Sequence, residues 1–118
     1  MRKRQRFIGR SKPVGKYRST LEKRFADLLD EQLKTGEIVR WRYEPQRFRL
    51  TDKDKLTTYT PDFSVMLPLG NKIFYEVKGF WTAKSRIKTK LFADQYWEYL
   101  VIGVQWKKKQ WVYEDFSA

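Results

Sequence analysis

The sequence predicts a mixed α+β (α/β) domain, in which a mixed central sheet is flanked by helices, one on each side. Two segments have apolar residues at helical spacing, and the segments between and after them are rich in β-branched and aromatic residues. Their order is helix, three strands with a short candidate strand after the first of them, helix and one or two further strands, which is typical of a sheet covered by helices. The chain has 118 residues, which is enough for one hydrophobic core and too few for two.

The first helix is expected to begin at Ser19 and to end at Gly36, a residue type that commonly follows the last helical turn. Its apolar stripe consists of Leu21, Phe25, Leu28, Leu29 and Leu33. A strand over residues 38–43 follows and ends before Pro45, and a short second strand covers residues 48–50.

Residues 57–66 are expected to form the next strand. Pro61 inside it favours an edge or a bulge over a central ladder position, because proline lacks the amide hydrogen. Residues 72–78 alternate in polarity and are expected to form a hairpin with that strand. The remaining expected elements are a helix over residues 83–97, with Ile87, Leu91, Phe92 and Tyr96 as its apolar residues, and strands over residues 99–106 and 111–113.

Histidine and cysteine are both missing from the sequence. Disulfides, cysteine-bound zinc, thiol nucleophiles, imidazole bases and histidine metal sites are therefore excluded. An enzyme of this composition must use carboxylates, lysine, hydroxyls or a hard metal ion. No apolar run approaches the roughly 20 residues that cross a bilayer, so we expect no membrane partner.

The net charge is +12, and its excess lies near the N-terminus, where residues 1–18 carry eight basic residues and no acid. We predict a flexible basic arm over residues 1–17 that binds nucleic acid, followed by a single domain over residues 18–118. A solvated tail without a partner is the alternative. The basic residues of this segment are Arg2, Lys3, Arg4, Arg6, Arg10, Lys12, Lys16 and Arg18.

Three charged residues on the expected hairpin are candidates for catalysis. Glu76 and Lys78 are two residues apart on one strand and share a face, and the hairpin can bring Asp62 beside them. Two carboxylates with an ammonium group suit Mg²⁺ or Mn²⁺. The alternative is that Glu76 and Lys78 are ordinary solvent-facing residues. Phe74 lies on the same face, however, and a carboxylate there is costly unless it is paired or metal-bound.

Glu22 has two interpretations. Ser19 and Glu22 have the spacing of a capping box, in which the Glu22 carboxylate bonds back to the Ser19 amide. Glu22 is also a third carboxylate that can join the hairpin acids. The residues alone favour the capping interpretation.

The pattern Pro61-Asp62 and Glu76-Val77-Lys78 resembles the PD-(D/E)xK nuclease signature. Around it, the blocks of residues 17–22, 58–63 and 74–81 resemble those of the phage endonuclease I family, whose members resolve Holliday junctions. The blocks occur in the same order and with similar spacing, and the likeness covers roughly residues 15–105.

This resemblance implies a restriction-endonuclease-like core and Mg²⁺-dependent hydrolysis of DNA, with Mn²⁺ as a substitute. Asp62, Glu76 and the Val77 carbonyl would be metal ligands, Lys78 would position the attacking water, and Glu22 would complete a second metal site. The resemblance also implies a homodimer, domain-swapped through a crossover at residues 51–57, in which Glu22 comes from the partner chain. The expected location is the cytoplasm of a bacterial host.

We expect further DNA contacts from residues after the Glu76 strand: Trp81, Lys84, Arg86 and Lys88. Other aromatic residues are either core residues or stacking platforms for unpaired bases: Trp41, Tyr43, Phe48, Phe74, Trp97, Trp106 and Trp111. A junction-resolving endonuclease is the first functional hypothesis. The alternatives are a nicking, restriction-like or transposase-like DNA endonuclease and a non-catalytic DNA-binding protein on a nuclease fold, and RNA stays open as a substrate.

Overall fold

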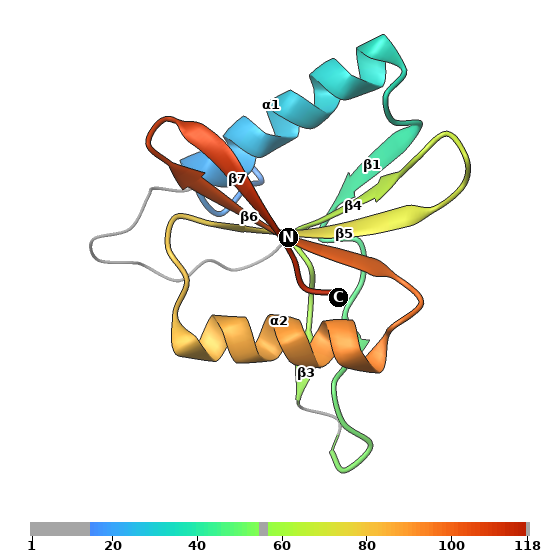
Figure 1. Cartoon of the computed structure of the whole chain (residues 1–118), viewed down its shortest axis with the longest axis vertical. Coiled ribbons are helices and arrows are strands. Elements are labelled where there is room, and N and C mark those ends of the chain that lie inside the picture. The colour runs from blue at the N-terminus through green and yellow to red at the C-terminus, as the bar shows by residue number, and fades with distance from the viewer. Residues whose placement is uncertain (1–14, 55–56, 118) are drawn as a thin grey trace.

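A computed structural model describes residues 15–54 and 57–117 of the chain (Figure 1). Most of the predicted arm, from Arg2 to Lys12, therefore lies outside the described residues. The elements are α1 (Thr20–Thr35), β1 (Arg40–Tyr43), β2 (Phe48–Arg49), β3 (Thr58–Tyr59), β4 (Phe63–Met66), β5 (Lys72–Lys78), α2 (Ala83–Gln95), β6 (Leu100–Lys107) and β7 (Gln110–Asp115).

The central sheet has five strands in the order β1-β4-β5-β6-β7. Strands β5 and β6 are parallel and are connected through α2, while the other neighbouring pairs are antiparallel. Strands β2 and β3 form a separate two-stranded sheet. The predicted mixed sheet is thus confirmed, and so is the predicted hairpin, which pairs β4 with β5.

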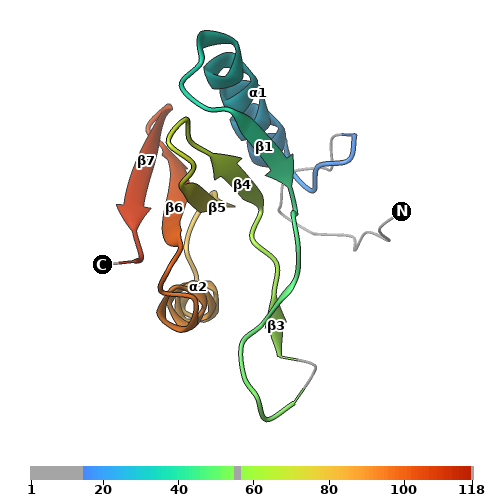
Figure 2. The same ribbon diagram turned by 90° about the vertical axis from the view of Figure 1, so that its right-hand side faces the viewer.

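The two helices cover opposite faces of the sheet, as predicted (Figure 2). On one face, Phe25 and Leu29 of α1 pack against a core that includes Phe63. On the other face, Phe92 of α2 packs in a core with Phe74. The side chains of β5 alternate between the two cores. Ile73 and Val77 pack in the core on the α1 side, and Phe74 packs in the core on the α2 side.

Helix α1 begins and ends where the sequence predicted. The Ser19 side chain accepts a hydrogen bond from the Glu22 amide, which caps the N-terminus. Gly36 has φ of +82°, a left-handed conformation, and its amide bonds back to Gln32 and Leu33. Tyr17, which the prediction assigned to the arm, is instead buried in the α1 core.

The strand predicted over residues 57–66 is wrong as one continuous element. The structure divides it into β3 and β4, with Pro61 in the break between them. Pro61 thus lies outside the ladders, in keeping with its missing amide hydrogen. Because of the break, β3 leaves the central sheet and pairs with β2, and its Tyr59 joins the α2 core.

Helix α2 turns a different face to the sheet than its apolar residues suggest. Thr89, Phe92 and Ala93 are its buried residues, whereas Ile87 and Leu91 are 60% and 49% exposed. Residues three and four apart share a helix face, so the stripe of Thr89, Phe92 and Ala93 places Ile87 and Leu91 on the outer side. Neither helix, within the described part of the chain, could span a membrane.

Gly103 of β6 allows two aromatic side chains to lie directly against the sheet. A Cβ atom at this position would be 2.5 Å from Cζ2 of Trp81 and 2.6 Å from Cε2 of Phe116. Gly103 is the register partner of Glu76 on β5. The missing side chain therefore lets Trp81 pack close to the acidic end of β5.

We expect Gly103→Ala to lower the free energy of unfolding by about 1–3 kcal/mol, because the added methyl overlaps packed rings. Urea denaturation followed by tryptophan fluorescence measures the change. Gly79→Ala is the matched control, since its Cβ would meet only Leu21 Cδ1 at 3.4 Å. Equal stability of the Gly103 and Gly79 variants would contradict this description of the packing.

Candidate active site

Asp62 and Glu76 lie next to each other on the hairpin. The Asp62 amide donates a hydrogen bond to the Tyr75 carbonyl (3.1 Å), which continues the β4–β5 pairing by one residue. Oδ2 of Asp62 accepts a hydrogen bond from the Val77 amide (2.8 Å). Both acids are buried, with 2% and 7% of their surfaces exposed. The predicted convergence of Asp62 and Glu76 is therefore present.

Both oxygens of Glu76 have partners. The Tyr59 hydroxyl donates to Oε1 (2.5 Å), and Nζ of Lys78 lies 3.2 Å from Oε2. The Tyr59 side chain comes from β3, so the break at Pro61 is what allows this contact. Lys78 keeps 29% of its side chain exposed, so its ammonium group borders both the buried acid and solvent.

The acid pair is electrostatically costly. Burial raises the pKa of Asp62 well above its usual range, and the negative charges of Glu76 and Glu22 raise it further. Burial also raises the pKa of Glu76, against the opposing effects of Lys78 and the Tyr59 hydrogen bond. Two neighbouring carboxylates in a poorly solvated site repel each other, so the ionised pair favours a positive charge between or beside them.

Glu22 comes to this site from the first turn of α1, where it is buried. Its Oε1 accepts hydrogen bonds from the Arg18 amide (2.8 Å) and from the Tyr43 hydroxyl (2.7 Å). The capping interpretation therefore holds for the Ser19 side chain, while the Glu22 carboxylate bonds to the amide of Arg18 rather than to that of Ser19. Glu22 is close enough to raise the pKa of Asp62.

Arg18, predicted as a DNA contact, is held among acids of the site. Its Nε lies 3.2 Å from Oε2 of Glu44, and its guanidinium nitrogen lies 3.6 Å from Oδ1 of Asp62. This cation compensates part of the charge of Asp62. A phosphate contact from Arg18 would have to compete with these ion pairs, so its role in DNA binding stays a prediction.

The other predicted DNA contacts differ in their exposure and in the contacts that they make. Arg86 forms a two-pronged ion pair with Glu114 (3.0 and 2.6 Å) and lies over the Trp81 ring at 5.5 Å. Trp81 itself packs against Phe116 and is only partly exposed. Among the predicted lysines, Lys16 and Lys84 are exposed and Lys88 is partly exposed.

Most of the aromatic candidates for base stacking belong to the cores. Phe48 and Phe74 are buried, and Trp41, Tyr43 and Trp111 pack against the α1 core. Trp106 lies against Trp111 and beneath the Arg24 guanidinium (4.5 Å). Trp97 is the exception, with 79% of its surface exposed.

The donor chemistry of the site fits one hard divalent ion. Mg²⁺ usually takes one or two carboxylates and keeps several waters, and Asp62 and Glu76 provide two oxygen donors that lack a full counter-charge. Among the described residues, no group of three or more acidic side chains is arranged to hold a metal. A second metal site completed by Glu22 therefore remains a prediction.

Sequence reasoning missed the two tyrosines that bind the acids. Tyr59 and Tyr43 contact Glu76 and Glu22 across 17 and 21 residues of sequence. No local spacing predicts such contacts. The available signal was that Tyr59 lies inside the block of residues 58–63 that carries the resemblance to nucleases.

A comparison with protein families returned the model described as phage endonuclease I, which matches residues 3–115. No curated protein matched the chain, and no solved structure did. The family match spans nearly the whole chain and includes Glu22, Asp62, Glu76 and Lys78.

We expect Asp62→Asn to stabilise the protein in EDTA at neutral pH. An unfolded aspartate ionises at about pH 4, whereas the folded carboxyl keeps its proton to higher pH. The native state thus binds more protons between these two values, and its stability falls as pH rises through that window. The amide variant escapes this loss, so we expect a melting temperature about 4 °C higher at neutral pH, which corresponds to about 1 kcal/mol.

Melting curves in EDTA between acidic and neutral pH measure this difference, which should vanish below about pH 4. Asp94→Asn removes an exposed carboxylate from α2 and should show no such pH-dependent gain. An Asp62→Asn protein that melts below the wild type at every pH would refute the claim that the ionised acid pair destabilises the fold.

Proposed function

The chain belongs to the phage endonuclease I family, and from this membership we propose that it is a Mg²⁺-dependent DNA endonuclease that cuts Holliday junctions. The observation that carries the proposal is the buried pair of Asp62 and Glu76 with Lys78 beside it. This arrangement agrees with the PD-(D/E)xK pattern of the sequence. Mn²⁺ is expected to replace Mg²⁺, because both prefer oxygen donors.

In this proposal, Asp62, Glu76 and the carbonyl of Val77 would hold the ion. A bound divalent ion would polarise the scissile phosphate and lower the pKa of a bound water. Lys78 orients the attacking water, since its ammonium borders both Glu76 and solvent. The water oxygen would bond to phosphorus as the bond between phosphorus and the 3′ oxygen breaks. The water gives up a proton and the departing 3′ oxygen takes one up, so that the ends are a 5′-phosphate and a 3′-hydroxyl.

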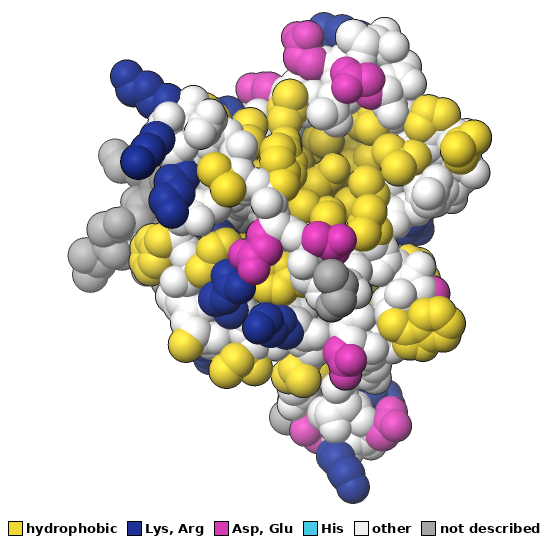
Figure 3. Space-filling view, in the orientation of Figure 1, with side chains coloured by type: hydrophobic (Ala, Val, Ile, Leu, Met, Phe, Trp, Pro, Cys, Tyr) yellow, Lys and Arg dark blue, Asp and Glu magenta, His cyan; other side chains and the backbone are white. Residues whose placement is uncertain are grey.

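The preference for branched DNA rests on the family and on symmetry. A junction offers paired, symmetric scissile sites, which suit a two-fold homodimer. Exposed apolar surface is compatible with such a dimer: Figure 3 shows hydrophobic side chains gathered between α1 and the sheet. Leu33, Val39, Val112 and Tyr113 are each at least 40% exposed. The domain swap remains an expectation, and its predicted crossover at residues 51–57 includes two residues outside the described range.

The function is tested by cleavage of a synthetic four-way junction beside matched duplex and single-stranded DNA. We expect paired symmetric cuts near the branch point with Mg²⁺ or Mn²⁺ and none with EDTA. Asp62→Asn, Glu76→Gln and Lys78→Met should each slow cleavage at least about 100-fold, because each removes a group that acts on the reacting phosphate or water. Junction binding should persist in all three.

Asp94→Asn, an exposed acid on α2, should cleave like the wild type and serves as the control. Equal cutting of all DNA forms would leave a nicking or restriction-like endonuclease and remove the junction claim. Binding without any cutting by the wild type would leave a non-catalytic DNA-binding protein.

Tyr59→Phe should raise the Mg²⁺ concentration needed for half-maximal cleavage about 10-fold, because the hydroxyl that orients Glu76 is lost. A Mg²⁺ titration of the cleavage rate measures the effect. Tyr96→Phe is the matched control, since the Tyr96 ring packs against the same core while its hydroxyl donates to the exposed Arg49 carbonyl instead of to Glu76. Identical Mg²⁺ requirements for the two variants would exclude a positioning role for Tyr59.

A further inference from the structure

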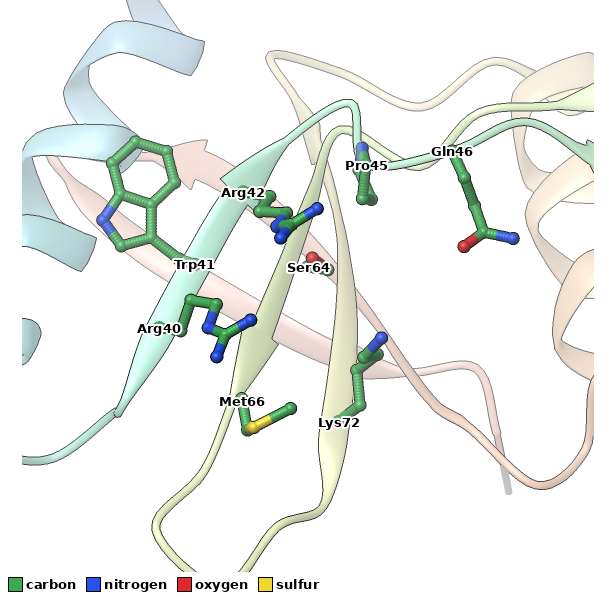
Figure 4. A pocket seen from close by; sticks show the side chains of 8 residues that line it. All are labelled: Arg40, Trp41, Arg42, Pro45, Gln46, Ser64, Met66 and Lys72. Atoms are coloured by element: carbon green, nitrogen blue, oxygen red, sulfur yellow. The ribbon is translucent and has the colours of Figure 1, made fainter.

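A cavity of about 210 Å³ lies over β1, β4 and β5 near the free edge of the sheet (Figure 4). Arg40 and Arg42 of β1 and Lys72 of β5 bring three cations to its lining. Ser64 of β4 contributes a hydroxyl, and Gln46 contributes a side-chain amide. None of these residues belongs to the predicted arm or to the acid site.

Among the described residues, the cations around the cavity have no acidic partner. No acidic side chain lines the cavity. Within the described ranges, Arg40, Arg42 and Lys72 form no ion pair, in contrast to Arg18 and Arg86. Like charges gathered around one cavity repel one another, so an anion bound there would relieve the repulsion.

The cavity and the acid site lie on the same face of the sheet. Lys72, Glu76 and Lys78 occupy even positions of β5 and therefore share a face, and Arg42 is the register partner of Ser64. Lys72 and Glu76 are four residues apart, which is about 13 Å along a strand. Phe74 lies between them on that face with Phe48 packed against it at 5.4 Å. This aromatic wall separates the two sites.

We propose that this cavity binds a backbone phosphate of the DNA substrate other than the scissile one. The identity of the ligand, a DNA phosphate, rests on the proposed function. The location of the site rests on the cavity and its cations. Guanidinium groups bind phosphate oxygens through paired N–H donors, and hydroxyl and amide groups add further hydrogen bonds. Because the wall keeps the cavity apart from Glu76, one nucleic acid that spans both sites must present two different phosphates.

The test compares two variants that lose the same three charges. One is Arg40→Gln/Arg42→Gln/Lys72→Gln, and the control is Lys107→Gln/Lys108→Gln/Lys109→Gln at the exposed β6–β7 turn. Affinity for the four-way junction is measured by fluorescence anisotropy in EDTA over a series of salt concentrations. A plot of log affinity against log salt has a negative slope, and each lost phosphate contact reduces its magnitude by about 0.9.

We expect the cavity variant to bind the junction about 10-fold more weakly, with a salt slope whose magnitude is reduced by the amount for about one phosphate contact. The control should stay close to the wild type in both affinity and slope. Arg42→Gln and Arg42→Lys repeat the comparison with a single change, and the lysine variant should keep most of the slope because it keeps the charge. Melting curves verify that each variant is folded.

Equal affinities and slopes for the cavity variant and the control would overturn the proposal. The cleavage assay separates this failure from that of the function. If the wild type cuts junctions and the cavity variant binds DNA like the control, only the proposal of the phosphate site is refuted. If the wild type binds junctions but never cuts them, and the cavity variant binds more weakly, the phosphate site is supported and the nuclease function is refuted.

Discussion

The burial of two neighbouring carboxylates is the constraint on which the rest of the structure depends. Asp62 and Glu76 are almost inaccessible to solvent, and burial together with mutual repulsion raises the pKa of Asp62. Four surrounding groups reduce the cost: the Val77 amide, the Tyr59 hydroxyl, the Lys78 ammonium and the Arg18 guanidinium. They do so incompletely, because the pKa values of both acids stay raised, and in the proposed function a bound cation would relieve the remaining repulsion.

The fold brings these groups together from separate parts of the chain. The break at Pro61 ends β3 and begins β4, so that Tyr59 reaches over Glu76 while Asp62 stays beside it. From the opposite side, helix α1 contributes Glu22, and the segment just before it contributes Arg18. The site is therefore assembled at the end of the hairpin, where elements from both faces of the sheet meet.

Local patterns predicted most of the elements and the meeting of Asp62 with Glu76 on a hairpin, while the contacts that other elements make with these acids could not be predicted. Alternation placed Glu76 and Lys78 on one face, and the helix signals Ser19 and Gly36 were confirmed. The broken strand, the exposure of Ile87 and the ion pairs of Arg18 depend on packing between elements that spacing does not reveal. The same is true of the basic cavity, whose cations come from two strands.

The proposed cation site at Asp62 and Glu76 is tested most directly by Mn²⁺ binding to the purified protein, followed by electron paramagnetic resonance in the absence of DNA. If the buried acid pair is a cation site, the wild type binds Mn²⁺ saturably, Mg²⁺ displaces it, and the double variant Asp62→Asn/Glu76→Gln loses this binding. Mn²⁺ binding that survives unchanged in the double variant, or that is missing from the wild type, would contradict a cation site at the buried acid pair.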